Sequence, residues 1–139
     1  MITVLIFLTA VAILIVVAAA LGRQRRSISP ENKSYTTTVA GVTKQNPDGT
    51  HRQQILKNRM YTGMPLRLEA EPENPHDPKA VAVYAANEKV GYLPRGYHID
   101  IFNALKQSRR VTATVEKLTG GTRDKPAHGL VIRLTKFRD

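Results

Sequence analysis

Acidic, amide and imidazole side chains gather in one short segment, residues 71–78, which reads Glu-Pro-Glu-Asn-Pro-His-Asp-Pro. Its three prolines fix φ and force extended or turned backbone, while Asn74 and Asp77 are side chains that bond readily to nearby backbone groups. The segment therefore predicts a stiff loop. A stiff loop holds side chains ready for binding at low entropic cost, although the same composition also suits a purely structural turn.

Catalytic patterns are sparse. His76 next to Asp77 resembles half of an acid/base pair, but neighbouring side chains in a strand or loop point away from each other and no Ser nucleophile accompanies them. There is no GxxxxGK[ST] phosphate loop, and the pair Gly120-Gly121 is not followed by Lys-Ser/Thr. We therefore predict no catalytic residues and exclude an ATPase.

Metal and cofactor ligands are not grouped either. The chain has no cysteine, which excludes disulfide scaffolds, zinc ribbons and thiol catalysis. The four histidines, His51, His76, His98 and His128, lie 25, 22 and 30 residues apart, whereas metal motifs contain much shorter separations. The sequence thus predicts neither a metal site nor a cofactor.

Six short segments favour β-strands, because apolar and polar residues alternate in them or β-branched residues cluster. Two others favour short helices. This pattern in about 100 residues predicts a mainly β fold with one or two short helices, a small curled barrel of the SH3 or OB kind. The predicted strands are 35–42, 66–70, 80–84, 90–93, 111–116 and 130–135, and the predicted helices are 51–59 and 97–107.

The helix over 51–59 is expected to begin at a Thr50 cap and to turn Ile55 and Leu56 inward, leaving Arg52, Gln53 and Lys57 in water. In the helix over 97–107, apolar residues recur every three to four positions, so one face should pack on the sheet. The tyrosines of this half of the chain are expected in the core or at its edge. They are Tyr84, Tyr92 and Tyr97.

The loop and its flanking strands carry a specific pattern. Residues 71–83 read EPxNPxDxxAVAV, residues 90–94 read VGYLP, and residues 39–43 read Val-Ala-Gly-Val-Thr before them. Over residues 35–136 the chain resembles the HIRAN domain. The resemblance implies a modified OB-like barrel that binds nucleic acid without catalysis of its own. In helicase-attached members the domain recognises the free 3′ end of single-stranded DNA.

The resemblance also implies roles for single residues around this loop. Asp77 matches the acidic residue that accepts a hydrogen bond from the terminal 3′-hydroxyl, a role that suits an acceptor-only carboxylate. His76 stands where the family has a base-stacking tyrosine, and His128 falls near the family's phenylalanine platform. Since imidazole offers a smaller face for stacking than these rings, weaker affinity is expected.

Cations fill other positions of the family's site. Thr43 and Lys44 replace a basic and aromatic pair, which keeps a cation for phosphate and loses the ring. Arg95, just after VGYLP, falls at a basic position and is expected to contact the nucleic-acid backbone. With Tyr92 of VGYLP, the predicted nucleic-acid-binding residues are Asp77, His76, Lys44, Thr43, Arg95, His128 and Tyr92.

Residues 1–22 form an apolar run without an ionisable side chain. As a helix the run reaches about 33 Å, which matches a hydrocarbon core of about 30 Å. A single transmembrane helix is the simplest interpretation. A secretory signal peptide is the main alternative, but no Lys or Arg precedes the run and the run exceeds an ordinary signal core. A buried core helix would need more surrounding protein than this chain supplies.

The charge pattern orients this predicted anchor. Arg23, Arg25 and Arg26 follow the apolar run, so the positive-inside rule predicts the amino terminus outside and the domain in the cytoplasm. Residues 23–34 are expected to form a polar, basic tether, and residues 35–139 the HIRAN-like domain.

The whole chain is basic, with 21 Lys and Arg against 11 Asp and Glu, which favours polyanionic partners. We therefore expect a membrane-anchored HIRAN module that binds nucleic acid, single-stranded DNA or a 3′ end. The alternative is a protein- or peptide-interaction module whose basic surface lies along anionic headgroups. The sequence leaves the oligomeric state open.

Overall fold

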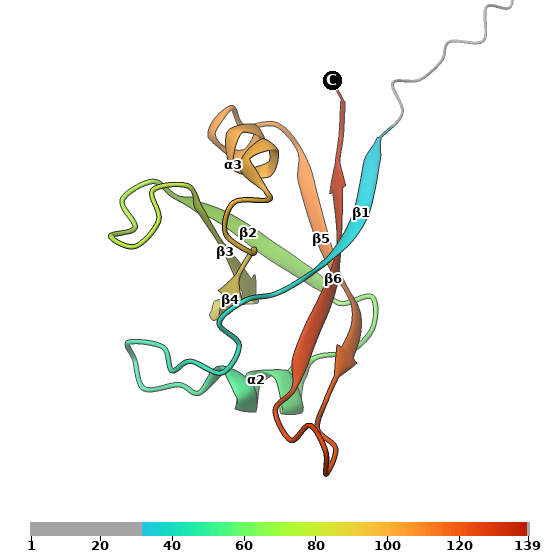
Figure 1. The fold of residues 1–139 in the computed structure, drawn as a ribbon. Coiled ribbons are helices and arrows are strands. Elements are labelled where there is room, and N and C mark those ends of the chain that lie inside the picture. The colour runs from blue at the N-terminus through green and yellow to red at the C-terminus, as the bar shows by residue number, and fades with distance from the viewer. Residues whose placement is uncertain (1–31, 139) are drawn as a thin grey trace, which may run out of the picture.

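The computed structural model describes residues 32–138 (Figure 1). The predicted membrane helix over residues 1–22 lies outside this part of the chain. Within residues 32–138, no helix is both long and apolar enough to cross a membrane. The fold is mainly β, as predicted. Its elements are β1 (Lys33–Thr38), α2 (Arg52–Arg59), β2 (Pro65–Glu71), β3 (Ala80–Ala85), β4 (Glu88–Tyr92), α3 (Ile99–Lys106), β5 (Val111–Thr119) and β6 (Gly129–Lys136).

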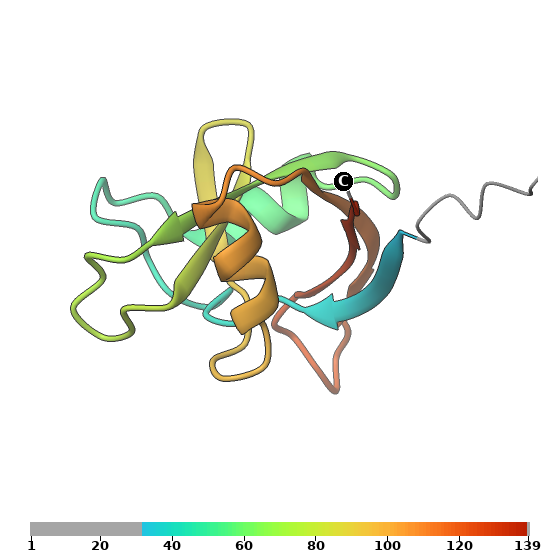
Figure 2. The ribbon, with the colours of Figure 1, turned by 90° about the horizontal axis from the view of Figure 1, so that it is seen from above.

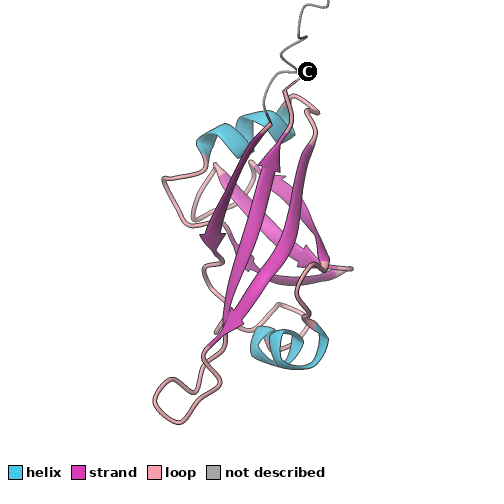
Figure 3. Ribbon diagram, turned by 90° about the vertical axis from the view of Figure 1, so that its right-hand side faces the viewer, coloured by secondary structure: helices cyan, strands magenta, loops and turns pink. Residues whose placement is uncertain are grey.

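The six strands form one antiparallel sheet in the order β1-β6-β5-β2-β3-β4. The sheet curls until its two edges approach, as the crossing strands in Figure 3 show. The chain beyond β1 then bridges to the end of β4, since the backbone N–H groups of Ala40 and Tyr92 donate to each other's carbonyls at 2.7 and 2.9 Å. This closure makes the sheet a small barrel and leaves few unpaired edge groups.

Alternating apolar residues explain why the sheet curls around a single core. Leu130, Ile132 and Leu134 of β6 are almost fully buried and alternate with more exposed residues, whereas β3 is apolar and buried along most of its length. The helices contribute Ile55 and Leu56 from α2 and Ile101 and Phe102 from α3. Ridges of these side chains fill the barrel and pack α3 against β2, β3 and β5.

Gly91 is required where the barrel closes. A Cβ at this position would lie 2.3 Å from the Ala40 carbonyl oxygen and 2.6 Å from the Val39 side chain. Only glycine lets the β4 backbone approach the segment after β1 this closely.

Several element boundaries differ from the prediction. β1 begins at Lys33, inside the stretch assigned to the tether, and ends at Thr38. His51, not Thr50, occupies the N-cap of α2, and it makes no side-chain capping bond. The backbone N–H of Thr50 donates to the Asp48 carboxylate at 2.9 Å. α3 begins at Ile99, since residues 95–97 form a turn in which Gly96 has φ of 86°.

The expectation that Arg52 faces water is wrong. Arg52 is only 6% exposed. Its Nε donates to the Asn46 side-chain oxygen at 2.7 Å and its guanidinium donates to the Gly41 carbonyl at 2.9 Å. Asn46, itself buried, donates to the Lys89 carbonyl at 2.8 Å. This pair therefore ties the loop after β1 to α2 and β4.

Candidate functional site

The loop between β2 and β3 is fixed from within by Asn74. The Asn74 side-chain oxygen accepts the backbone N–H groups of His76 at 2.9 Å and Asp77 at 3.1 Å. The Asp77 Oδ1 atom in turn accepts the backbone N–H of Lys79 at 3.0 Å. These successive side-chain turns, together with the prolines, give the Asp77 carboxylate a defined position.

Asn74 is held by a half-buried network at the end of β2. Its amide donates to Glu71, whose carboxylate also accepts from Lys89 Nζ at 2.7 Å and from the Tyr92 hydroxyl at 3.0 Å. Burial alone would raise the pKa of Glu71, but the bonds from Lys89, Asn74 and Tyr92 outweigh it and hold that pKa below its usual value. Burial alone would lower the pKa of Lys89, but the bonds to Glu71 and Tyr92 outweigh it and raise that pKa above its usual value. Glu71 and Lys89 therefore stay charged, and their network supports the β2–β3 loop at the end of β2.

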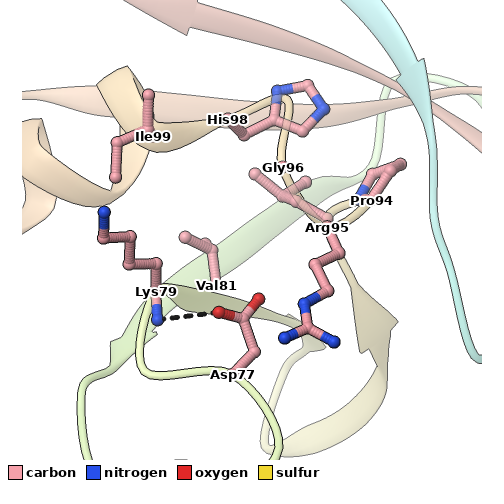
Figure 4. Close-up of a pocket in the computed structure, with 9 residues that line it drawn as sticks. Asp77, Lys79, Val81, Pro94, Arg95, Gly96, His98 and Ile99 are labelled. Atoms are coloured by element: carbon pink, nitrogen blue, oxygen red, sulfur yellow. Dashed lines mark hydrogen bonds between the residues drawn. The ribbon is translucent and has the colours of Figure 1, made fainter.

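A cavity of about 140 Å³ lies between this loop and the connection from β4 to α3. Asp77 and Lys79 form one side, Arg95 and Gly96 the opposite side, and the floor is apolar. Figure 4 shows the Asp77 carboxylate and the Arg95 guanidinium directed into the same space, with the bond from the Lys79 backbone to Asp77 dashed. The apolar lining comes from Val81, Leu93, Pro94 and Ile99.

His98 closes the cavity on the side of β1. Its Nδ1 lies 3.0 Å from the Tyr35 hydroxyl, its Nε2 lies 3.2 Å from Thr37 Oγ1, and its ring stacks on Tyr35 at 5.7 Å between centroids. Burial lowers the pKa of His98, and the nearby Asp100 carboxylate offsets only part of this effect. Burial of Tyr35 raises the pKa of its hydroxyl to about 12, and the negative charge of Asp100 adds a smaller effect in the same direction. His98 is therefore a neutral wall that joins α3 to β1.

Three other predicted residues, Thr43, Lys44 and His128, belong to segments that meet at Gln53 of α2. The Gln53 amide donates to the Val42 carbonyl at 3.0 Å and to the His128 carbonyl at 2.9 Å, and its oxygen accepts the His128 N–H at 2.7 Å. Gln53 thus joins the segment that carries exposed Thr43 and Lys44 to the loop before β6. Figure 2 shows the β4–α3 connection and the tip of the β5–β6 hairpin on the same side of the barrel.

Of the predicted residues, Asp77 and Arg95 share the cavity. His76 is exposed on the same loop, and Tyr92 lies on its other side, bonded to Glu71. Lys79, His98 and Ile99 also line the cavity and are not among the residues predicted from the sequence. Lys79 lies within the recognised motif and was therefore detectable, whereas His98 and Ile99 are brought in only by the path of the chain into α3.

Tyr97 corrects another expectation. The sequence predicts Tyr97 in the core or at its edge, yet 81% of its surface is exposed. It belongs to the turn at 95–97, between Gly96 and His98, which both line the cavity. Tyr97 itself does not line the cavity, and its exposed ring is available for stacking on a flat ligand.

The fold and the loop-lined cavity define a small single-domain β-barrel of the kind that serves as a binding module. The HIRAN domain family matches residues 33–127, and the chain belongs to that family. HIRAN domains are binding modules that generally act on nucleic acid, including DNA 3′ ends.

Two crystal structures share the fold. A protein from Lactobacillus plantarum aligns with a TM-score of 0.55 at 21% identity, over 76% of this chain and 99% of that one. The HIRAN domain of human HLTF aligns with a TM-score of 0.54 at 17% identity, over 74% of each chain. The search of curated proteins finds no match.

Proposed function

We propose that this chain binds single-stranded nucleic acid at a 3′ end, with the end held in the cavity between the β2–β3 loop and the β4–α3 connection. The observation that carries the proposal is the half-buried Asp77 carboxylate facing Arg95 across this cavity. At about 140 Å³ the cavity is smaller than the roughly 300–1,000 Å³ of ordinary small-molecule sites, so it suits one end group.

The chemistry of the lining fits a terminal nucleotide. Asp77 Oδ1 is occupied by the Lys79 N–H, while Oδ2 accepts no hydrogen bond from residues 32–138 and is free for a ligand hydroxyl. The Arg95 guanidinium and the Lys79 ammonium supply cations for a phosphate. The apolar floor suits the face of a sugar. Exposed Tyr97 compensates for the rings that His76 and His128 replace.

The experiment that tests this proposal uses the full chain in neutral detergent and a fluorescent single strand ending in a 3′-hydroxyl or a 3′-phosphate. We expect tighter binding of the hydroxyl end. Asp77→Asn should weaken it about 10- to 100-fold, because one charge-assisted hydrogen bond is worth about 1.5–3 kcal/mol. Fluorescence anisotropy measures both affinities.

Glu73→Gln is the matched control, since it removes one charge from the exposed part of the same loop outside the cavity. If Asp77→Asn and Glu73→Gln lose affinity equally, the effect of Asp77→Asn comes from the change in net charge and not from a specific contact of Asp77. Equal affinity for the two ends would contradict end recognition, and no binding at all would favour the protein-interaction alternative.

We further propose that residues 1–22 anchor the chain in a membrane with the domain on the cytoplasmic side. The composition of that segment and the three arginines after it support this proposal. Because the chain lacks cysteine, a single reporter such as Asp124→Cys can be labelled selectively. A membrane-impermeant maleimide should modify it only after the cells are permeabilised. Labelling of intact cells would contradict the orientation.

A further inference from the structure

Basic side chains from two strands, a helix and the segments next to them lie at one end of the barrel. Lys33 of β1 pairs across the sheet with Lys136 of β6, and Lys33 and Arg138 line the same shallow hollow. The Arg110 guanidinium lies 4.4 Å from the centre of the Phe137 ring, and the Arg110 carbonyl accepts the Phe137 N–H. We name this surface the basic end. It consists of Lys33, Lys106, Arg109, Arg110, Lys136 and Arg138.

The charge of the basic end is poorly compensated. Five of its six side chains are exposed, and the sixth, Lys136, is half-buried. Within residues 32–138 the one acidic partner of these six is Asp100, whose carboxylate lies 3.5 Å from Lys136 Nζ. Glu31 and Asp139, next to the basic end in sequence, lie outside the described residues. By contrast, the tip of the β5–β6 hairpin mixes signs, with Arg123 and Lys125 flanking Asp124.

The basic end is also where the chain enters the domain. Figures 1 and 2 show the start of β1, the end of the chain after β6 and α3 gathered at one end of the barrel. In Figure 1, α2 and the tip of the β5–β6 hairpin lie at the other end. Lys33 follows Gly22 by 11 residues, which span at most about 40 Å. Any membrane that holds residues 1–22 is therefore close to the basic end.

We propose that the basic end lies against anionic phospholipid headgroups of the bilayer that residues 1–22 enter. This inference rests on the proposed membrane anchoring and is independent of nucleic-acid binding. Basic side chains are drawn to an anionic leaflet when they come within about 8 Å of it, the screening length at physiological salt. Arg23, Arg25 and Arg26 lie in sequence between residues 1–22 and Lys33 and add to the positive charge. The contact fixes the orientation of the barrel above the bilayer.

The test uses the full chain reconstituted into vesicles of phosphatidylcholine alone or with 30% phosphatidylserine. A fluorophore on Gln107→Cys, an exposed position after α3, reports energy transfer to labelled headgroups, and Asp124→Cys reports from the opposite end. We expect phosphatidylserine to raise transfer from position 107 at least twofold more than from position 124. About 1 M salt should remove the difference, because it shortens the screening length to about 3 Å.

Charge-reversal variants distinguish an effect of the basic end from an effect of the net charge of the chain. Arg109→Glu, Arg110→Glu and Arg138→Glu together should abolish the phosphatidylserine effect at position 107. The control, Lys57→Glu, Lys117→Glu and Arg123→Glu together, changes the net charge equally at exposed positions outside the basic end and should preserve the effect. Loss of the effect in both variants, or equal transfer in the two lipid mixtures, would overturn the proposal.

Two further measurements distinguish this proposal from the proposed membrane anchor and from the proposed nucleic-acid binding. Failure of the unmodified chain to float with neutral vesicles would overturn the anchor and the basic-end contact together. Loss of oligonucleotide binding in the Arg109/Arg110/Arg138 variant, with transfer at position 107 unchanged, would overturn the lipid contact and assign the basic end to nucleic acid. Retained end-specific binding with unchanged affinity supports separate surfaces for the two partners.

Discussion

Asn74 shows how one short side chain determines where a neighbouring carboxylate lies. Its oxygen accepts two consecutive backbone N–H groups, its amide donates to Glu71, and Glu71 is fixed in turn by Lys89 and Tyr92. Tyr92 therefore supports the Asp77 loop from outside the cavity. Its predicted contact with nucleic acid remains a prediction, while its bond to Glu71 gives it a positioning role.

Tyr97 is the exposed ring that we propose for base stacking in place of the substituted positions. Base stacking on an exposed ring is worth about 1–3 kcal/mol per base. We expect Tyr97→Ala to weaken binding of a single strand about 5- to 100-fold and Tyr97→Phe to retain it, since the ring and not the hydroxyl is used. Anisotropy titrations measure both. Tyr61→Ala, which removes another exposed tyrosine away from the cavity, is the control. An unchanged affinity in Tyr97→Ala would contradict stacking.

His98 should make the stability of the fold depend on pH. Burial lowers its pKa below the unfolded value of about 6.5, so the unfolded chain binds the proton more tightly than the folded one. The stabilisation is present above about pH 6.5 and is lost as the pH falls from there through the lower folded pKa. Tm should therefore rise as the pH is raised to about 7, and His98→Asn should flatten this rise. A variant with an unchanged pH profile would contradict the assignment.

The strands were largely predictable and the connections were not. Alternation in Leu130, Ile132 and Leu134 indicates a strand because one face of a sheet must be buried, and the six strands follow from such local patterns. The expectations for Tyr97 and Arg52 are wrong because helical periodicity carries no information on the loops that precede the two helices. The turn that contains Gly96 delays the start of the predicted helix to Ile99, and Asn46 provides the partner that allows Arg52 to be buried.

Barrel closure depends on the close approach of β4 to the segment after β1. Gly91→Ala places a Cβ within 2.3 Å of the Ala40 carbonyl oxygen, so the bridge between Ala40 and Tyr92 must widen. Overpacking of this kind costs about 1–3 kcal/mol. We expect a lower denaturation midpoint in urea with unchanged cooperativity. Gly63→Ala is the control for backbone strain without overpacking, because Gly63 has φ of 85° and no atom lies within 4 Å of an added Cβ. Equal stability of Gly91→Ala and the unmodified chain would contradict the packing argument.

The cavity and the basic end are different surfaces of the barrel, and the sequence indicates only the first of them. The motif led to Asp77 and Arg95, which share one cavity, because the loop and the β4–α3 connection both belong to the recognised pattern. Thr43, Lys44 and His128 gather elsewhere through Gln53. The sequence did not predict the basic end, because β1, α3 and β6 contribute to it from positions up to about 100 residues apart.

This division predicts how salt should act on nucleic-acid binding. For single strands, log K falls with log salt at a slope of about −0.7 for each phosphate neutralised. If Arg95 and Lys79 each contact a phosphate in the cavity, Arg95→Ala and Lys79→Ala should each make the slope less steep by about 0.7. Arg109→Ala combined with Arg110→Ala should leave the slope unchanged, although it removes twice the charge of either single variant. Titrations of the full chain in neutral detergent between about 50 and 300 mM salt measure these slopes. A slope that follows total charge, whichever residues are removed, would show that the cavity has no special part in binding.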